Sequence, residues 1–200
     1  MPGSAAVTIW CDVAAEARDE FEDWHTREHM PERLAIPGFL RGTRWRSEQP
    51  GSFFILYELD SPATLTGAAY LARLNDPTPW SRKMMPHHRN MVRSLCMVRS
   101  RYGEGLPQAM ATLRFSDRSI GVELPGRKKG ITGAALLEAQ PASGPRTTEQ
   151  EIRGGDASAD RVLLVGGYDA KAVKAVTLEI ELAGAVAGFY HLAYSLTAQK

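Results

Sequence analysis

The stretch "VTIWCDVAAEARDEFEDWHTREHMPERLAIPGF", residues 7–39, predicts how the chain begins its fold. Residues 7–13 are rich in β-branched and aromatic side chains, which favour a strand. From Ala14 onward the apolar residues recur with the period of a helix, and charged residues fill the opposite face. Pro31 and the "IPG" at 36–38 interrupt this pattern, because proline and glycine end helices. The stretch therefore predicts a strand followed by an amphipathic helix.

Further elements complete the first half of the chain. Strand-like segments at residues 39–47 and 53–60 are joined by a turn-forming "EQPGS", and a helix is expected at 61–74. A fourth strand is expected at 90–102. The order β-α-β-β-α-β is that of a ferredoxin-like unit.

The second half echoes the first. Strand patterns recur at 110–116, 130–141, in the first part of 161–176, and at 188–196, whereas 117–130 is too short and broken to repeat the first helix. We infer an internal duplication, with units at 1–104 and 105–200. The predicted fold class is α+β: two tandem ferredoxin-like units packed sheet to sheet as an intramolecular dimeric α/β barrel, the second unit degenerate. Residues 142–160 are polar and glycine-rich, which indicates a mobile loop.

Composition excludes several classes of protein. The chain has 200 residues, 44% of them hydrophobic, and a formal net charge of +1, so it can bury a core and has no strong field for nucleic acid or anionic membranes. Neither a signal-peptide pattern nor an apolar run of about 20 residues is present, so we expect a cytoplasmic protein. Cys11 and Cys96 lie in apolar runs and are expected to be reduced core residues.

His25 and His29 are the most informative polar residues. On a helix they share a face, and Glu28 falls near the expected centre of the buried side. Ionisable groups there either pair with one another, for example His25 with Glu28, or border a cavity. The letters H-T-R-E-H also match a zinc signature. We expect no metal, because Pro31 ends the helix and the available third ligands, Cys96 and Glu104, lie in an apolar strand and a flexible turn.

The segment "F-x-x-W-H-x-x-x-H-M-P" at 21–31, followed by "IPGF" and the "RW" at 44–45, resembles the EthD-like branch of the dimeric α/β barrel superfamily. The resemblance covers roughly residues 5–102. It implies a pocket between the sheet and the helices, with His29 in the place of the family's H-x-P histidine. Trp24 or His25 stands near an upstream aromatic residue that is often a tyrosine in relatives. The superfamily includes decarboxylases, cyclases, isomerases, cofactor-free monooxygenases and haem enzymes.

We therefore expect a cofactor-free enzyme acting on a small apolar or aromatic molecule. His29, with His25 as its partner, would move a proton, since imidazole titrates near neutral pH. Arg44 would hold a carboxylate or enolate oxygen. The other residues expected to bind substrate are aromatic or acidic: Trp10, Trp24, Glu28, Tyr57 and Trp80. The reaction type stays open.

Two alternatives stand beside this hypothesis. One is haem chemistry with a histidine as axial ligand; the other is a non-catalytic ligand-binding or structural barrel. His87 and His88 are expected to be exposed, and His191 to make a hydrogen bond inside the barrel. The pseudo-dimer needs no partner chain, although further oligomerisation is left open.

Overall fold

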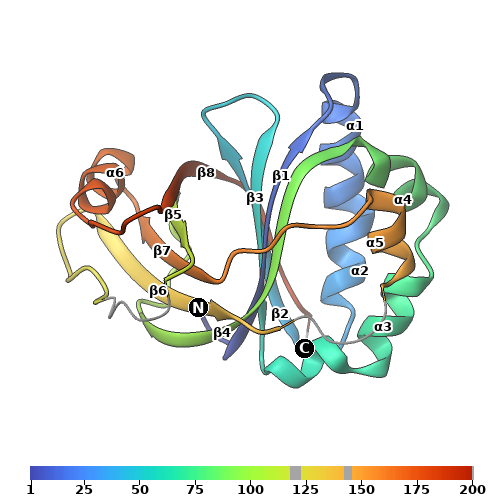
Figure 1. The fold of residues 1–200 in the computed structure, drawn as a ribbon, viewed down its shortest axis with the longest axis horizontal. Coiled ribbons are helices and arrows are strands. Elements are labelled where there is room, and N and C mark those ends of the chain that lie inside the picture. Colours follow the sequence, from blue (N-terminus) through green and yellow to red (C-terminus); the bar gives the residue numbers. More distant parts are fainter. Residues whose placement is uncertain (118–122, 142–145, 200) are drawn as a thin grey trace.

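The protein is a closed barrel of eight antiparallel strands (Figure 1). The computed structural model describes residues 1–117, 123–141 and 146–199. The order of the strands around the barrel is β1-β3-β2-β8-β5-β7-β6-β4. The bounds of the strands are β1 Ala5–Val13, β2 Phe39–Ser47, β3 Ser52–Leu59, β4 His88–Tyr102, β5 Ala109–Phe115, β6 Ile131–Ala139, β7 Arg161–Gly167 and β8 Val186–Thr197.

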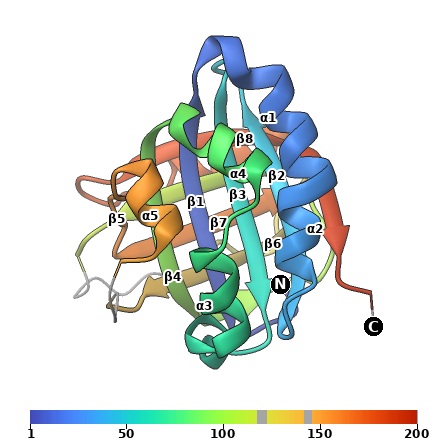
Figure 2. The same cartoon turned by 90° about the vertical axis from the view of Figure 1, so that its right-hand side faces the viewer.

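The helices α1 to α5 cover one side of the barrel, and α6 lies on the opposite side (Figures 1 and 2). The bounds of the helices are α1 Arg18–Trp24, α2 Met30–Leu34, α3 Ala68–Asn75, α4 Pro79–Met84, α5 Thr148–Arg153 and α6 Ala170–Leu178. A π-helical turn, His25–His29, joins α1 to α2, and single 3-10 turns are formed by Ala15–Ala17, Pro62–Thr66 and Met85–His87. None of the helices in the described ranges has the length and apolar character needed to cross a membrane.

The predicted packing of two separate sheets face to face is wrong. Instead, the edge strands of the two halves pair with each other, β2 with β8 from Arg41↔Thr197 to Ser47↔Tyr190, and β4 with β6 from Cys96↔Ala139 to Tyr102↔Ala134. An open sheet edge leaves backbone N–H and C=O groups unpaired, and closure into a barrel satisfies them. The result is one continuous sheet.

Side chains of β1 alternate between two environments, as the period of a strand requires. Val7 and Cys11 belong to the apolar cluster beneath α1 and α2, whereas Ala6 and Trp10 belong to a second cluster. The Trp10 indole N–H donates to the Thr112 hydroxyl at 3.1 Å. Since Thr112 lies on β5, which is not a neighbour of β1, the second cluster fills the barrel interior. A third cluster lies between α6 and the strands of the second half.

The first half contains the predicted strands and helices in the predicted order, with one further helix, α4, between α3 and β4. In the second half the four strands are present, and the described residues 123–130 contain no helix, while 118–122 lie outside the described residues. The predicted loop at 142–160 is wrong in part, because Thr148–Arg153 forms α5; residues 142–145 lie outside the described ranges.

Candidate functional site

The π turn at His25–His29 arranges the aromatic side chains of the site. The Met30 N–H bonds to the His25 carbonyl, five residues back. The rings of Trp24 and His29 lie 4.4 Å apart, although they too are five residues apart in sequence. On a regular α-helix that separation would place them about 140° apart around the axis. The π turn therefore brings Trp24, His25 and His29 to one face, and such turns are frequent at functional sites.

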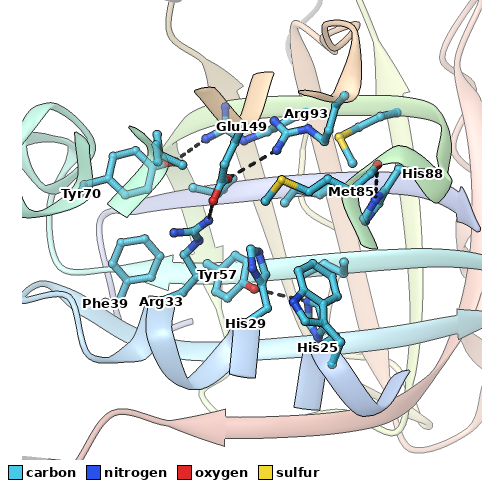
Figure 3. A pocket seen from close by; sticks show the side chains of 17 residues that line it. His25, His29, Arg33, Phe39, Tyr57, Tyr70, Met85, His88, Arg93 and Glu149 are labelled. Carbon is cyan, nitrogen blue, oxygen red and sulfur yellow. Dashed lines mark hydrogen bonds and ion pairs between the residues drawn. The ribbon is translucent and has the colours of Figure 1, made fainter. Parts of the chain in front are cut away.

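That face borders a pocket between the outer surface of β1, β3 and β4 and the helices α2, α3 and α5 (Figure 3). Its apolar walls come from strands and helices alike, and include Val7, Ile9, Phe39, Ile55, Leu74, Met85 and Met91. The volume of the pocket that a water-sized molecule can occupy is about 40 Å³. A larger hollow of about 580 Å³ adjoins the pocket and shares Tyr70, Leu74, Arg93 and Arg153 with it.

Three histidines line the pocket. His25 is buried, and its Nε2 atom lies 3.4 Å from the Tyr57 hydroxyl. His29 is half-buried, and His88 places its Nδ1 atom 3.0 Å from the Met85 carbonyl. The Nδ1 atoms of His25 and His29 are buried and have no hydrogen-bond partner among the described residues. Unpaired buried polar atoms are rare in proteins, so this part of the pocket is suited to a polar ligand group.

Burial keeps these histidines neutral at physiological pH. It lowers the pKa of His25 well below the usual value, and Arg44 and His88 lower it further. Burial also lowers the pKa of His29 strongly, with Arg33 as the next cause. The pKa of His88 is lowered to about 4, mainly by burial. A neutral imidazole has a free lone pair, so each ring can accept a proton.

Charged side chains from α2 and α5 line the pocket beside the histidines (Figure 3). Arg33 on α2 forms a buried ion pair with Glu149 on α5, and Arg153 reaches the other Glu149 oxygen at 3.4 Å. Arg153 also pairs with Asp156 at 2.9 Å. Burial is the largest single influence on the pKa of Arg33 and lowers it, but Glu149, Tyr70 and Tyr57 together raise the pKa above its ordinary value. Arg33 is therefore a permanent cation inside the pocket.

Four of the residues predicted from sequence line this pocket: Trp24, His25, His29 and Tyr57. They come from the end of α1, from the π turn and from the outward face of β3. The Trp24 indole N–H donates to the Ser81 hydroxyl at 3.2 Å, which fixes the ring beside His29. Burial raises the pKa of Tyr57, so its hydroxyl keeps its proton beside His25.

The other predicted residues lie elsewhere. Glu28 does not pair with His25; it accepts hydrogen bonds from Thr78 at 2.6 Å and Ser81 at 3.4 Å, because the π turn rotates it away from the histidines. Arg44 is buried against Glu22, with its Nη1 atom 3.1 Å from the Glu22 carbonyl.

Both remaining tryptophans also have structural partners. Trp80 donates to Glu20 at 3.1 Å, and Trp10 fills the barrel interior. None of Glu28, Arg44, Trp10 and Trp80 lines the pocket.

Several pocket residues escaped prediction. His88 was expected to be exposed, but it lines the pocket, whereas His191, expected inside the barrel, is exposed. His87 is half-buried and lies 4.0 Å from Glu16. No local sequence pattern predicts the ion pair between Arg33 and Glu149, since 116 residues separate them.

Within the described ranges, no group of three His, Cys, Asp or Glu side chains is arranged to hold a metal ion.

Comparison with solved structures shows the fold. The chain superposes on an anthrone oxidase-like protein with a TM-score of 0.57, at 8% identity over 98% of this chain and 94% of that one. A provisionally named monooxygenase of Fusobacterium nucleatum gives a TM-score of 0.55, at 9% identity over 98% and 96% of the two chains. One from Lactobacillus acidophilus gives 0.53, at 7% identity over 98% and 97%. No family model and no curated protein matches the sequence.

Proposed function

We propose that this protein is a cofactor-free enzyme that removes a proton from a small apolar or aromatic molecule, with His29 as the base. The observation that carries the proposal is the group of three neutral imidazoles on one apolar pocket, two of them with an unpaired buried Nδ1 atom. His29 is only half-buried and so can meet a ligand, whereas His25 lies deeper, against Tyr57.

The chemistry follows from the charges around the imidazole. A pKa far below neutral makes an imidazole a weak base in the empty pocket. When the substrate loses its proton, negative charge develops beside the ring, and that charge raises the pKa of His29 and stabilises the imidazolium. Tyr57 and His25 contact each other beside the base, and the ring centroids of His25 and His29 lie 5.7 Å apart. Arg33, four residues beyond His29 in the chain, supplies a fixed positive charge beside the base.

The names of the structural neighbours favour oxygenation as the overall reaction. Anthrone is a suitable probe, because its methylene group between two aromatic rings is acidic. In the balanced reaction with dioxygen, this carbon loses two hydrogens and gains a carbonyl oxygen; the second oxygen atom leaves as water. The protein's part is to take the first proton and hold the resulting enolate.

Haem is the superfamily cofactor that requires a test against this site. The space beside the histidines is about 40 Å³, so haem and an aromatic substrate alike would need it to join the adjoining hollow of about 580 Å³. The Nε2 atom of His25 is directed to the Tyr57 hydroxyl at 3.4 Å and not to open space. His25 is therefore not free to act as an axial ligand, and we derive no step through haem.

The experiment is oxygen uptake with anthrone and no added cofactor. We expect the wild-type protein to consume dioxygen and form the quinone, and His29→Gln to lose at least about a hundredfold in rate, the usual contribution of a positioned base. His191→Gln is the matched control, since His191 is exposed and does not line the pocket. Binding without turnover in the wild type would favour the non-catalytic ligand-binding alternative.

We also propose that the chain arose by the duplication of one unit. The strand order of the first half, β4-β1-β3-β2, is repeated in the second half as β8-β5-β7-β6. This repetition supports a tandem duplication with a boundary near residue 104, whereas the proposal of an EthD-like first unit rests on the motif at residues 21–31.

A further inference from the structure

The helix α5 is held against the pocket by charge. Of its six residues, the buried one is Glu149, whose carboxylate is bound by Arg33 across the pocket (Figure 3). Helices of globular proteins normally dock through an apolar stripe. A second polar contact runs from the Thr148 N–H to the Asn75 side chain at 3.1 Å. The position of α5 therefore depends on an ion pair, which an anion can replace.

The pocket carries more positive than negative charge. Its lining includes Arg33, Arg93 and Arg153 but one carboxylate, that of Glu149. Arg93 donates to the Tyr70 hydroxyl, which is not an anion. Arg33 is 4% exposed, and its Nη1 atom has no hydrogen-bond partner in the described part of the chain. A buried guanidinium with a free N–H, in a low-dielectric pocket, is a strong donor to an anionic oxygen.

Movement of α5 would leave this guanidinium without its carboxylate. Glu149 pairs with Arg153 of the same helix at 3.4 Å, and Arg153 also pairs with Asp156 at 2.9 Å, so both carboxylates keep a cationic partner when they move with α5. Arg33 belongs to α2 and would stay behind as an unpaired buried charge, which is strongly unfavourable until an anion binds. Both the pocket and the adjoining hollow of about 580 Å³ are lined by α5 residues, so displacing the helix would join the two spaces.

We propose that the pocket binds a small aromatic or apolar molecule with an anionic oxygen group, a carboxylate or an enolate, and that this group replaces the Glu149 carboxylate on Arg33 as α5 moves aside. The proposal rests on the proposed function in one respect, that the same pocket takes the substrate. It adds the class of ligand and the residue that recognises it.

Two probes of the same shape test the charge requirement. 1-Naphthoate carries a carboxylate, and 1-naphthamide is its neutral counterpart. By titration calorimetry we expect naphthoate to bind the wild-type protein at least about tenfold more tightly, the effect of one charge-assisted contact. Arg33→Gln should remove the preference, whereas Glu149→Gln should bind naphthoate more tightly than wild type because the internal competitor is lost. Arg99→Gln, which alters an exposed ion pair with Glu138, should behave as wild type.

Arg33→Gln alone leaves Glu149 buried without that partner and can fail to fold. The double variant Arg33→Gln/Glu149→Gln replaces the pair by neutral groups of similar size. It should bind both probes alike if Arg33 recognises the anion; a preference for naphthoate that survives in the double variant would overturn the proposal. Equal binding of the two probes by wild type would overturn it as well.

Hydrogen exchange tests the movement of α5. Amides of residues 148–153 should exchange faster when naphthoate is bound than when it is absent, because the helix leaves the pocket. Unchanged or slower exchange there would contradict the displacement. These measurements involve no turnover, so their failure is distinguishable from a failure of the anthrone assay. The protein can prefer naphthoate without oxidising anthrone, and it can oxidise anthrone without preferring naphthoate.

Discussion

Acidification should unfold this protein through its pocket histidines. Each of His25, His29 and His88 has a pKa below the ordinary value of about 6.5, because burial disfavours the charged ring. The unfolded chain therefore binds more protons than the folded protein once the pH falls below about 6.5. Stability is complete above that pH and decreases as the pH is lowered toward the folded-state values.

The magnitude can be worked for His88, whose folded-state pKa is about 4. At about pH 5 the ring is protonated in the unfolded chain but neutral in the folded protein. The difference corresponds to roughly 1.5 pH units, or about 2 kcal/mol of lost stability. His25 and His29 add losses of the same sign. A total of several kcal/mol is a large share of the roughly 5–15 kcal/mol that stabilises a typical domain.

Urea unfolding followed by circular dichroism at about pH 7.5 and pH 5 measures this loss. His88→Gln removes one titrating group, so its stability should decrease by about 2 kcal/mol less than that of wild type between the two pH values. His191→Gln, at an exposed position, should show the wild-type pH dependence. If His88→Gln and His191→Gln share the same dependence, the account of a buried neutral His88 is refuted.

Three further predictions concern the rest of the structure. Glu149→Gln leaves Arg33 buried without its carboxylate and should lower the free energy of unfolding by roughly 3–5 kcal/mol in urea titrations, whereas a double variant, Arg33→Met/Glu149→Leu, should recover most of the loss; equal losses in both would contradict the pair's role. Burial raises the pKa of Cys11 and Cys96 to about 12, so neither thiol should react with iodoacetamide near pH 8 until denaturant is added, and rapid labelling of the native protein would show that a thiol is accessible. Phe21→Ala empties a fully buried site beneath α1 and should cost about 3–5 kcal/mol by urea unfolding; a loss below about 1 kcal/mol would mean that α1 does not pack as described.

Local patterns predicted most of the secondary structure and part of the site. The alternation of side chains in residues 7–13 and the helical period after Ala14 are set by neighbours in sequence, so they can be recognised without a structure. The same holds for the placing of His25 and His29 on one face. Tyr57 was predicted as part of an aromatic group on the strands, and it does line the pocket.

Features that depend on distant parts of the chain were not predictable. Closure of the barrel requires β2 to pair with β8, and an edge strand has the same alternating pattern whether its neighbour belongs to its own half or the other. Glu149 lines the pocket, although its segment, residues 142–160, has the polar and glycine-rich composition of a loop. The prediction for Glu28 was wrong because it assumed a regular helix, in which about 100° per residue would point that side chain inward. The π turn at His25–His29 changes this angle.

The central claim is that an imidazole of the pocket removes a proton from a carbon acid. Under anaerobic conditions in D₂O, proton NMR can follow the exchange of the anthrone methylene hydrogens without any oxygenation. The account predicts that the wild-type protein accelerates this exchange and that His29→Gln does not, while His191→Gln exchanges as wild type. Exchange that is no faster with the protein than without it, or equally fast in His29→Gln, would contradict the claim.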